Sequence, residues 1–126
     1  MKGKILIADD EESIRETFRL ILEGDGYEVE TADSLSRCIT RMQTESFDLL
    51  FLDVMFGVES GIDAIERLKI LQPGCEIVVI TGNPQVEALV KARSRGAFDY
   101  LAKPVRQPSL LYHAQKVLAG KGTVVH

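Results

Sequence analysis

The sequence predicts an α/β protein with a doubly wound, five-stranded parallel sheet and five helices. Short apolar runs alternate with segments of helical periodicity along the whole chain, which is typical of consecutive strand–helix units. Three of the apolar runs show no polar alternation, so we expect them to be interior strands buried on both faces. With right-handed crossovers, the simplest strand order for five such units is 2-1-3-4-5.

The five expected strands are short. The first, third and fourth are residues 4–8, 49–52 and 77–80, which read Lys-Ile-Leu-Ile-Ala, Leu-Leu-Phe-Leu and Ile-Val-Val-Ile. The second, residues 27–31, alternates apolar and polar side chains, as an edge strand with one solvated face does. The last strand is expected at residues 98–102. Most of the phenylalanines are expected in the core, namely Phe18, Phe47, Phe51 and Phe98.

The expected helices follow the strands, and each carries apolar residues at helical spacing. They are residues 12–24, a segment that begins after Ser34, residues 60–71, a segment from Pro84 to Arg95, and a last helix that begins at Pro108. Ser34 and Asn83 are of the residue types that cap helix starts, and Pro84 suits the first helical position.

The size and charge of the chain exclude several classes of protein. A length of 126 residues allows one domain, expected over residues 1–120, with residues 121–126 as a tail or the start of a linker. The net charge of −4 argues against direct binding of nucleic acid. No apolar run reaches the length of a membrane span and no signal peptide is present, so we expect a cytoplasmic protein. Cys38 and Cys75 are expected to be free thiols.

Polar residues follow four of the five strands, at the edge where the carboxyl ends of parallel strands form a crevice. Asp9 and Asp10 follow the first strand, Asp53 the third, Thr81 the fourth and Lys103 the last. Three ionised carboxylates at one place repel each other, and a hard dication such as Mg²⁺ would relieve that repulsion. An aspartate held in this way can act as a nucleophile toward a phosphoryl group, whose oxygens the hydroxyl and the ammonium would stabilise.

Each of these residues also has a purely structural explanation. An acidic pair before a helix stabilises the helix dipole, an aspartate or a threonine caps a loop or a helix, and a lysine in a loop is solvated. The arrival of all of them at the correct strand ends favours the chemical interpretation.

At these residues the chain resembles the receiver domain of two-component response regulators, over nearly its whole length. The resemblance is carried by Asp9-Asp10-Glu11, Leu52-Asp53-Val54-Met55, Ile80-Thr81-Gly82 and residues 96–104, Gly-Ala-Phe-Asp-Tyr-Leu-Ala-Lys-Pro. It implies a flavodoxin-like fold and the transfer of a phosphoryl group from the phosphohistidine of a sensor kinase to Asp53. It implies that Mg²⁺ is held by Asp10, by Asp53 and by the backbone carbonyl of Met55, with Asp9 acting directly or through water.

The resemblance also implies a switch. Thr81 would move to the phosphoryl oxygen, Tyr100 would turn inward, and the surface of the fourth helix, fifth strand and fifth helix would change. Family members usually have a cis peptide at the position of Lys103-Pro104. The implied partners are a sensor histidine kinase or a phosphotransfer domain, and family analogy suggests a homodimer on phosphorylation. Such a protein modifies itself and is a switch, not a turnover enzyme.

The loop after Asp53 departs from the family pattern. Gly57 stands where the family usually has proline, and Ser60 stands where it usually has aspartate. Because glycine loosens a loop that proline would stiffen, we expect a more mobile loop and a weaker hold of the Met55 carbonyl on Mg²⁺. Ser60 is still expected to cap the helix that begins at Gly61.

Two other classes of protein compete with a phosphorylated receiver. A pseudo-receiver, an interaction module that is not phosphorylated, fits the drift at Gly57 and Ser60 but not the complete set of site residues. A different flavodoxin-like protein fits less well. The acidic segment after the first strand would repel a flavin phosphate, and a phosphohydrolase with an Asp-x-Asp nucleophile would leave Asp53 without a role.

Overall fold

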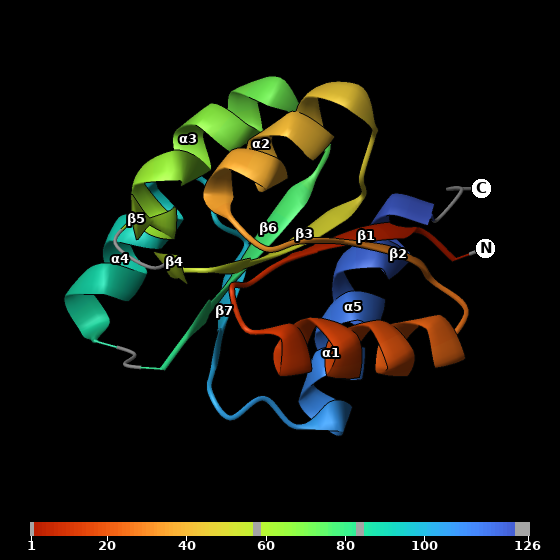
Figure 1. The fold of residues 1–126 in the computed structure, drawn as a ribbon. Coiled ribbons are helices and arrows are strands. Elements are labelled where there is room, and N and C mark those ends of the chain that lie inside the picture. The colour runs from red at the N-terminus through yellow and green to blue at the C-terminus, as the bar shows by residue number, and fades with distance from the viewer. Residues whose placement is uncertain (1, 57–58, 83–84, 123–126) are drawn as a thin grey trace.

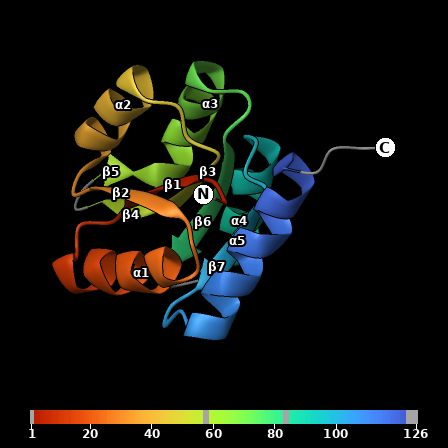
Figure 2. The same ribbon diagram turned by 90° about the vertical axis from the view of Figure 1, so that its right-hand side faces the viewer.

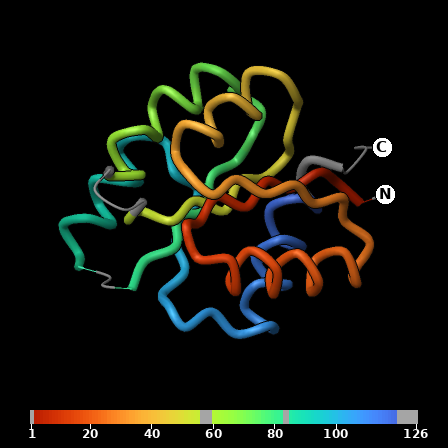
Figure 3. Tube along the Cα trace, in the orientation of Figure 1, coloured from red at the N-terminus to blue at the C-terminus, as the bar shows by residue number. Residues whose placement is uncertain are grey.

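The computed structural model describes residues 2–56, 59–82 and 85–122. Its main sheet has five parallel strands in the order β2-β1-β3-β6-β7, which confirms the predicted order of the five strands. The strands are β1 (Lys4–Ala8), β2 (Glu28–Ala32), β3 (Leu49–Asp53), β6 (Glu76–Thr81) and β7 (Asp99–Ala102). A separate antiparallel pair, β4 (Met55–Phe56) with β5 (Glu59–Ser60), follows β3 and was not predicted. Figure 3 shows β1, β2 and β3 beginning at one end of the molecule and running toward the other.

Five helices cover the two faces of the sheet. They are α1 (Glu12–Gly24), α2 (Leu35–Thr44), α3 (Gly61–Leu71), α4 (Val86–Ser94) and α5 (Gln107–Gly122). Helices α1 and α5 lie on one face, and α2 and α3 lie on the other (Figures 1 and 2). Helix α4 packs with the second group, because its buried Ala92 joins the core cluster of α2 and α3. Helix α5 extends two residues past the expected domain boundary at residue 120, and residues 123–126 lie outside the described part of the chain.

The interior strands are buried on both faces, as their uninterrupted apolar sequences predict. Alternate side chains of β1, β3 and β6 enter two separate cores. Leu6, Leu50 and Ile77 belong to the core under α2 and α3. Ile7 and Phe51 belong to the core under α1 and α5. The sheet is thus held between two apolar layers, and its polar strand ends project from the edge.

Phe98 was expected in the core, and that prediction is wrong. It is 37% exposed, whereas Phe18, Phe47 and Phe51 are buried as predicted. Phe98 precedes β7, which is an edge strand with only one strand neighbour. Its backbone N–H donates to the carbonyl of Ile77, while the Lys116 ammonium lies 5.9 Å from the centre of its ring.

The helix starts follow the predicted caps in part. Ser34 caps α2, because its hydroxyl accepts a hydrogen bond from the backbone N–H of Arg37 at 3.1 Å. Ser60 occupies the cap position of α3 as expected, but its side chain makes no capping hydrogen bond to a described residue. Helix α4 begins at Val86, later than predicted, because Gln85 before it has extended backbone dihedrals. Asn83 and Pro84 lie outside the described residues.

The two cysteines are buried and form no disulfide with each other, as predicted. Burial raises the pKa of the Cys38 thiol to about 12. Cys75 is also almost fully buried. Neither thiol has the exposure of a reactive cysteine, so both serve as small core residues.

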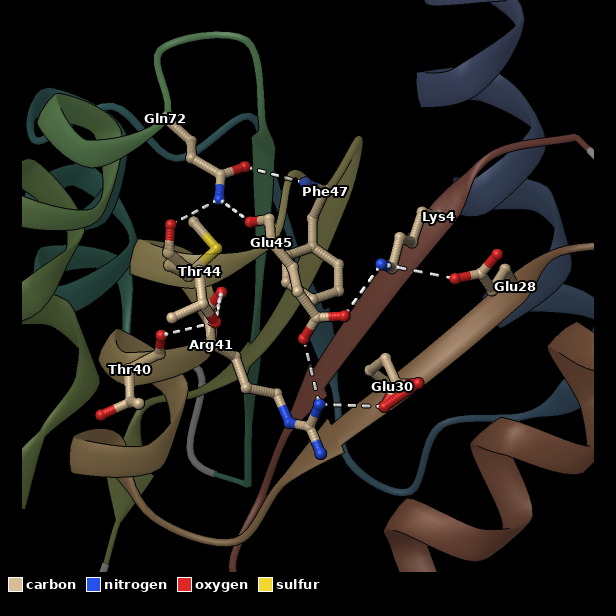
Figure 4. Close-up of polar contacts among 10 residues, drawn as sticks. Lys4, Glu28, Glu30, Thr40, Arg41, Thr44, Glu45, Phe47 and Gln72 are labelled. Carbon is tan, nitrogen blue, oxygen red and sulfur yellow. Dashed lines mark hydrogen bonds and ion pairs between the residues drawn. The ribbon is translucent and has the colours of Figure 1, made fainter.

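Ion pairs tie α2 to the edge of the sheet (Figure 4). The Lys4 ammonium, at the start of β1, lies 2.9 Å from the Glu45 carboxylate and 3.4 Å from that of Glu28. The Arg41 guanidinium on α2 lies 3.1 Å from Glu45 and 3.0 Å from Glu30 on β2. Glu45 therefore joins two cations, and Lys4 and Arg41 each join two carboxylates.

The Gln72 amide closes the same region. Its oxygen accepts a hydrogen bond from the backbone N–H of Phe47 at 2.8 Å, and its nitrogen donates to the carbonyls of Met42 and Glu45. The residue after α3 thereby satisfies backbone groups at the end of α2, as Figure 4 shows.

Replacing Glu45 with glutamine is expected to lower the free energy of unfolding at pH 7 by about 0.5–1 kcal/mol. The hydrogen bond from Lys4 lowers the pKa of Glu45 below its ordinary value of 4.5. The stabilisation from the ion pairs of Glu45 is therefore fully present at pH values above 4.5, and it is lost as the pH falls through the lowered pKa. Urea unfolding of both chains at pH 7 and at about pH 3 checks this.

The difference between the two chains should shrink at the lower pH. Glu66→Gln is the matched control, because Glu66 is exposed and has no ion pair among the described residues. A difference that stays the same at both pH values would contradict the role of the ion pairs.

Candidate functional site

The structure brings Asp9, Asp10 and Asp53 together at the carboxyl ends of β1 and β3. One carboxylate oxygen from each residue lies within 4.8 Å of the others. The cause is the register of two neighbouring parallel strands, in which Ala8 pairs with Leu52, so the residues that follow them emerge side by side. Asp9 is fully buried and Asp53 is 3% exposed, whereas Asp10 is exposed.

Backbone N–H groups orient the two buried carboxylates. The N–H of Glu11 donates to Asp9 Oδ1 at 2.9 Å, and the N–H of Met55 donates to Asp53 Oδ1 at 3.0 Å. In each case the donor lies two residues after the aspartate, which fixes one oxygen and leaves Oδ2 directed elsewhere. Asp9 Oδ2 is buried and has no hydrogen-bond partner among the described residues.

Lys103 lies between the two buried aspartates. Its ammonium is 3.4 Å from Asp9 Oδ2, 3.5 Å from Asp53 Oδ2 and 3.5 Å from the Glu11 carboxylate. Its backbone N–H donates to the carbonyl of Thr81 at 2.8 Å, which ties the loop after β7 to the end of β6. The peptide bond from Lys103 to Pro104 is cis, as the resemblance implied.

The cluster is short of positive charge. Burial is the main effect that raises the pKa of Asp9 and of Asp53, and each is lowered in part by its backbone N–H donor. Burial alone would lower the pKa of Lys103, but Asp9 and Asp53 outweigh it and the pKa is raised. The Lys103 ammonium thus pairs with Asp9, Asp53 and Glu11, and a cluster of three close aspartates favours a further cation.

The donor atoms fit a hard dication. Every side-chain ligand in the cluster is a carboxylate oxygen, and among the described residues no histidine or cysteine joins it. Oxygen ligands of this kind suit Mg²⁺, and Asp9 Oδ2, which has an ion pair with Lys103 but no hydrogen bond, provides a lone pair for an ion or its water. Met55, the expected carbonyl ligand, has its backbone beside Asp53 while its side chain is 64% exposed.

The two expected switch residues lie on neighbouring strands. Thr81 ends β6 and is buried, one residue after Ile80, which pairs with Asp53. Tyr100 lies in β7 and is 38% exposed, so its ring is not part of the core. The structure therefore places Thr81 beside the strand that bears Asp53, and Tyr100 toward the surface.

The sequence did not predict a role at the site for three residues. Glu11 pairs with Lys103, and its place next to Asp10 was the available signal. Arg15, one helical turn later, donates from Nη1 to the carbonyl oxygen of Asp9 at 2.9 Å. Gly61 begins α3 against the backbone of β3. A Cβ atom there would lie 2.5 Å from the carbonyl oxygen of Asp53, which explains the need for glycine.

Comparisons with known proteins agree with this geometry. Residues 5–115 match the family model of the response regulator receiver domain. The alginate biosynthesis transcriptional regulatory protein AlgB of Pseudomonas syringae pv. tomato is 40% identical over 117 residues, which cover 93% of this chain and 26% of that protein. The chain thus spans about a quarter of the length of the curated relatives it matches.

Solved structures share the fold. A CheY-like response regulator receiver domain protein from Methanospirillum hungatei JF-1 superposes with a TM-score of 0.90 at 31% identity, covering 94% of each chain. A response regulator protein from Burkholderia pseudomallei, with a phosphorylated aspartic acid, a calcium ion and citrate, superposes with a TM-score of 0.82 at 32% identity. The match covers 98% of this chain and 76% of that one. No helix in the described part of the chain has the length and apolarity of a membrane span.

Gly61→Ala is expected to lower the free energy of unfolding by about 1–3 kcal/mol, because the new methyl group meets main-chain atoms that cannot rotate away. The Cβ would also lie 3.0 Å from Val54 Cα. Urea unfolding followed by circular dichroism measures the change.

Gly24→Ala is the matched control. Gly24 ends α1, and a Cβ added there would meet nothing within 4 Å outside its own helix turn, so this chain should be as stable as the parent or slightly more so. Equal stability of the Gly61 variant and the parent would contradict the close approach of α3 to β3.

Proposed function

The chain belongs to the response regulator receiver domain family, and on that premise we propose that Asp53 accepts a phosphoryl group from a phosphohistidine. The donor is a sensor histidine kinase or a phosphotransfer domain, and the site of action is the cytoplasm. The observation that carries the proposal is the cluster of Asp9, Asp10 and Asp53, with the Lys103 ammonium beside Asp9 and Asp53. The phosphorylated aspartic acid in the similar Burkholderia pseudomallei protein supports it.

The residues that would hold Mg²⁺ are Asp10, Asp53 and the Met55 carbonyl, with Asp9 as a ligand directly or through water. A bound dication supplies positive charge to the oxygens of the incoming phosphoryl group. The buried Asp9 and the N–H donors of Glu11 and Met55 keep the carboxylates oriented before the donor arrives, which reduces the reorganisation that the transfer requires.

The transfer itself uses the chain's own groups. An oxygen of Asp53 forms a bond to phosphorus as the phosphorus–nitrogen bond of the donor imidazole breaks, and the electron pair returns to the ring nitrogen. The Lys103 ammonium, already 3.5 Å from Asp53, stabilises the phosphoryl oxygens, and the Thr81 hydroxyl donates to one of them. The product is an acyl phosphate on Asp53, so the chain changes its own state and turns over no separate substrate.

A hollow of about 440 Å³ lies beside Lys103 and suits the approach of a donor domain. Its walls include Ile14 and Phe18 of α1, and Pro104 and Val105 of the loop after β7. This mixed apolar surface would receive a helix of the donor and bring its histidine to the carboxylate cluster.

The output of phosphorylation is a shift between two conformations of the α4, β7 and α5 surface. Tyr100 lies in β7 and Thr81 ends the neighbouring strand β6, and movement of Thr81 toward a phosphoryl group would leave space for the Tyr100 ring. Val86 and Val90 on α4 are 74% and 62% exposed, so the surface has apolar side chains for a second copy of the chain or for an attached domain.

A pseudo-receiver that binds a partner without phosphorylation is the alternative. The departures at Gly57 and Ser60 favour it, whereas the intact carboxylate cluster and the placement of Lys103 favour phosphorylation.

Incubation of the chain with Mg²⁺ and acetyl phosphate, followed by intact mass measurement, is expected to add one phosphoryl group. Asp53→Asn removes the nucleophile and should show no gain, while Asp48→Asn keeps Asp53 and should gain as the parent does. Failure of the parent with acetyl phosphate and also with a phosphorylated histidine donor, while Mg²⁺ still binds, would establish the pseudo-receiver.

Gly57→Pro is expected to increase the affinity for Mg²⁺, because proline restricts the loop that leads from Met55 to α3. The measurement is a Mg²⁺ titration of both chains by isothermal calorimetry at the same ionic strength. Identical affinities would show that the glycine has no influence on the metal site.

A further inference from the structure

A second hollow, separate from the carboxylate cluster, is lined by arginines. It has a volume of about 430 Å³ and lies between α1, α2 and the end of β2. Its lining includes Arg15 from α1, Arg37, Thr40 and Arg41 from α2, and Thr31 and Asp33 at the end of β2. We propose that this hollow, here called the arginine pocket, binds a phosphorylated small molecule.

The first argument is charge. Three guanidinium groups and one carboxylate give the lining a formal charge of +2, in a chain whose net charge is −4. Glu30 and Glu45 pair with Arg41 from outside the lining, as Figure 4 shows, so the formal charge of the lining together with these two partners is zero. The positive charge is therefore localised on the guanidinium groups and is not a net charge of the region, so an anion would be held by their N–H donors.

The second argument is the supply of hydrogen-bond donors. Arg15 uses Nη1 for the carbonyl of Asp9, Arg37 uses Nε for Asp33 at 3.3 Å, and Arg41 uses Nη1 for its two glutamates. A guanidinium has three nitrogens and five N–H donors, so each arginine keeps a second and a third nitrogen for a ligand. The hydrogen bond of Arg15 and the two ion pairs of Arg41 restrict these two side chains, which lowers the entropy lost on binding.

The third argument is the match of size and chemistry. Phosphate oxygens accept paired hydrogen bonds from arginine with favourable geometry. The volume lies within the range of about 300–1,000 Å³ that is usual for small-molecule sites, so there is room for an organic group beside the phosphate. The Thr31 and Thr40 hydroxyls offer contacts to that group. A single hollow between two helices suits such a ligand better than an extended acidic peptide.

The arginine pocket is linked to the carboxylate cluster through the backbone. The Arg15 guanidinium donates to the carbonyl of Asp9, and the N–H of Asp9 donates to the carbonyl of Ala32, which also lines the pocket. A ligand that moves Arg15 therefore changes the surroundings of Asp9. Linkage is reciprocal, so ligand binding and Mg²⁺ binding should alter each other's affinity. This coupling rests on the proposed function, whereas the binding itself does not.

The test is a titration of the ¹⁵N-labelled Asp53→Asn chain, without Mg²⁺, with inorganic phosphate, glucose 6-phosphate and adenosine 5′-monophosphate. At least one probe is expected to shift the amides of residues 31–33 and 37–41 to saturation, and glucose and adenosine should not. Arg37→Gln should weaken binding about tenfold, the effect of losing one charge-assisted hydrogen bond. Arg93→Gln, an exposed arginine on α4, is the control and should bind as the parent does.

Three results would overturn the proposal. They are no saturable shift with any of the three probes, equal binding by the parent and Arg37→Gln, and tighter binding of an acidic peptide than of every phosphorylated probe. Arg37 is 74% exposed, so its replacement leaves the core untouched and a loss of binding is not a failure to fold.

The coupling is tested in the parent chain by a Mg²⁺ titration with and without the saturating probe. The Mg²⁺ affinity should change, and the change should be absent in Arg15→Gln. An unchanged affinity in the parent would overturn the coupling. A chain that binds the probe but no Mg²⁺ would instead contradict the proposed function.

Discussion

The enclosure of two aspartates at the ends of neighbouring strands is the constraint on which the rest of the site depends. Asp9 and Asp53 are almost without solvent contact, and burial makes their charged forms costly. The Lys103 ammonium and two backbone N–H groups offset part of that cost. A further positive charge would offset the remaining cost, so the same imbalance of charge favours the proposed binding of a dication.

The two cores make this enclosure possible. Because apolar side chains of β1, β3 and β6 fill both faces of the sheet, the strands are held firmly and their ends have fixed positions. Residues that follow paired positions, such as Ala8 and Leu52, then lie side by side, and no additional contact is needed to bring them together. The proposed switch involves the edge of the sheet formed by β7, where Tyr100 is already near the surface.

Much of this could be predicted from the sequence, and the failures have physical causes. Continuous apolar runs identify doubly buried strands, so the sheet order and the convergence of Asp9, Asp53 and Lys103 followed from pattern alone. Phe98 was misplaced because its type favours burial, whereas its exposure depends on the missing neighbour of an edge strand. The contacts of Glu11 and Arg15 depend on side-chain directions in three dimensions, which residue type and spacing do not specify. The short pair of β4 and β5 is too brief for periodicity to show.

The contact between α3 and β3 fixes both ends of the segment that follows β3. The N–H of Gly61 donates to the carbonyl of Val54 at 2.9 Å, so the excursion that leaves β3 returns to the point where it began. Its ends are closed by one hydrogen bond and by a glycine that admits no side chain. Because both ends of the segment are fixed, substitutions between them need not displace Asp53. The departures from the family pattern at Gly57 and Ser60 can thus coexist with the close cluster of Asp9, Asp10 and Asp53, because the fixed ends separate the two regions.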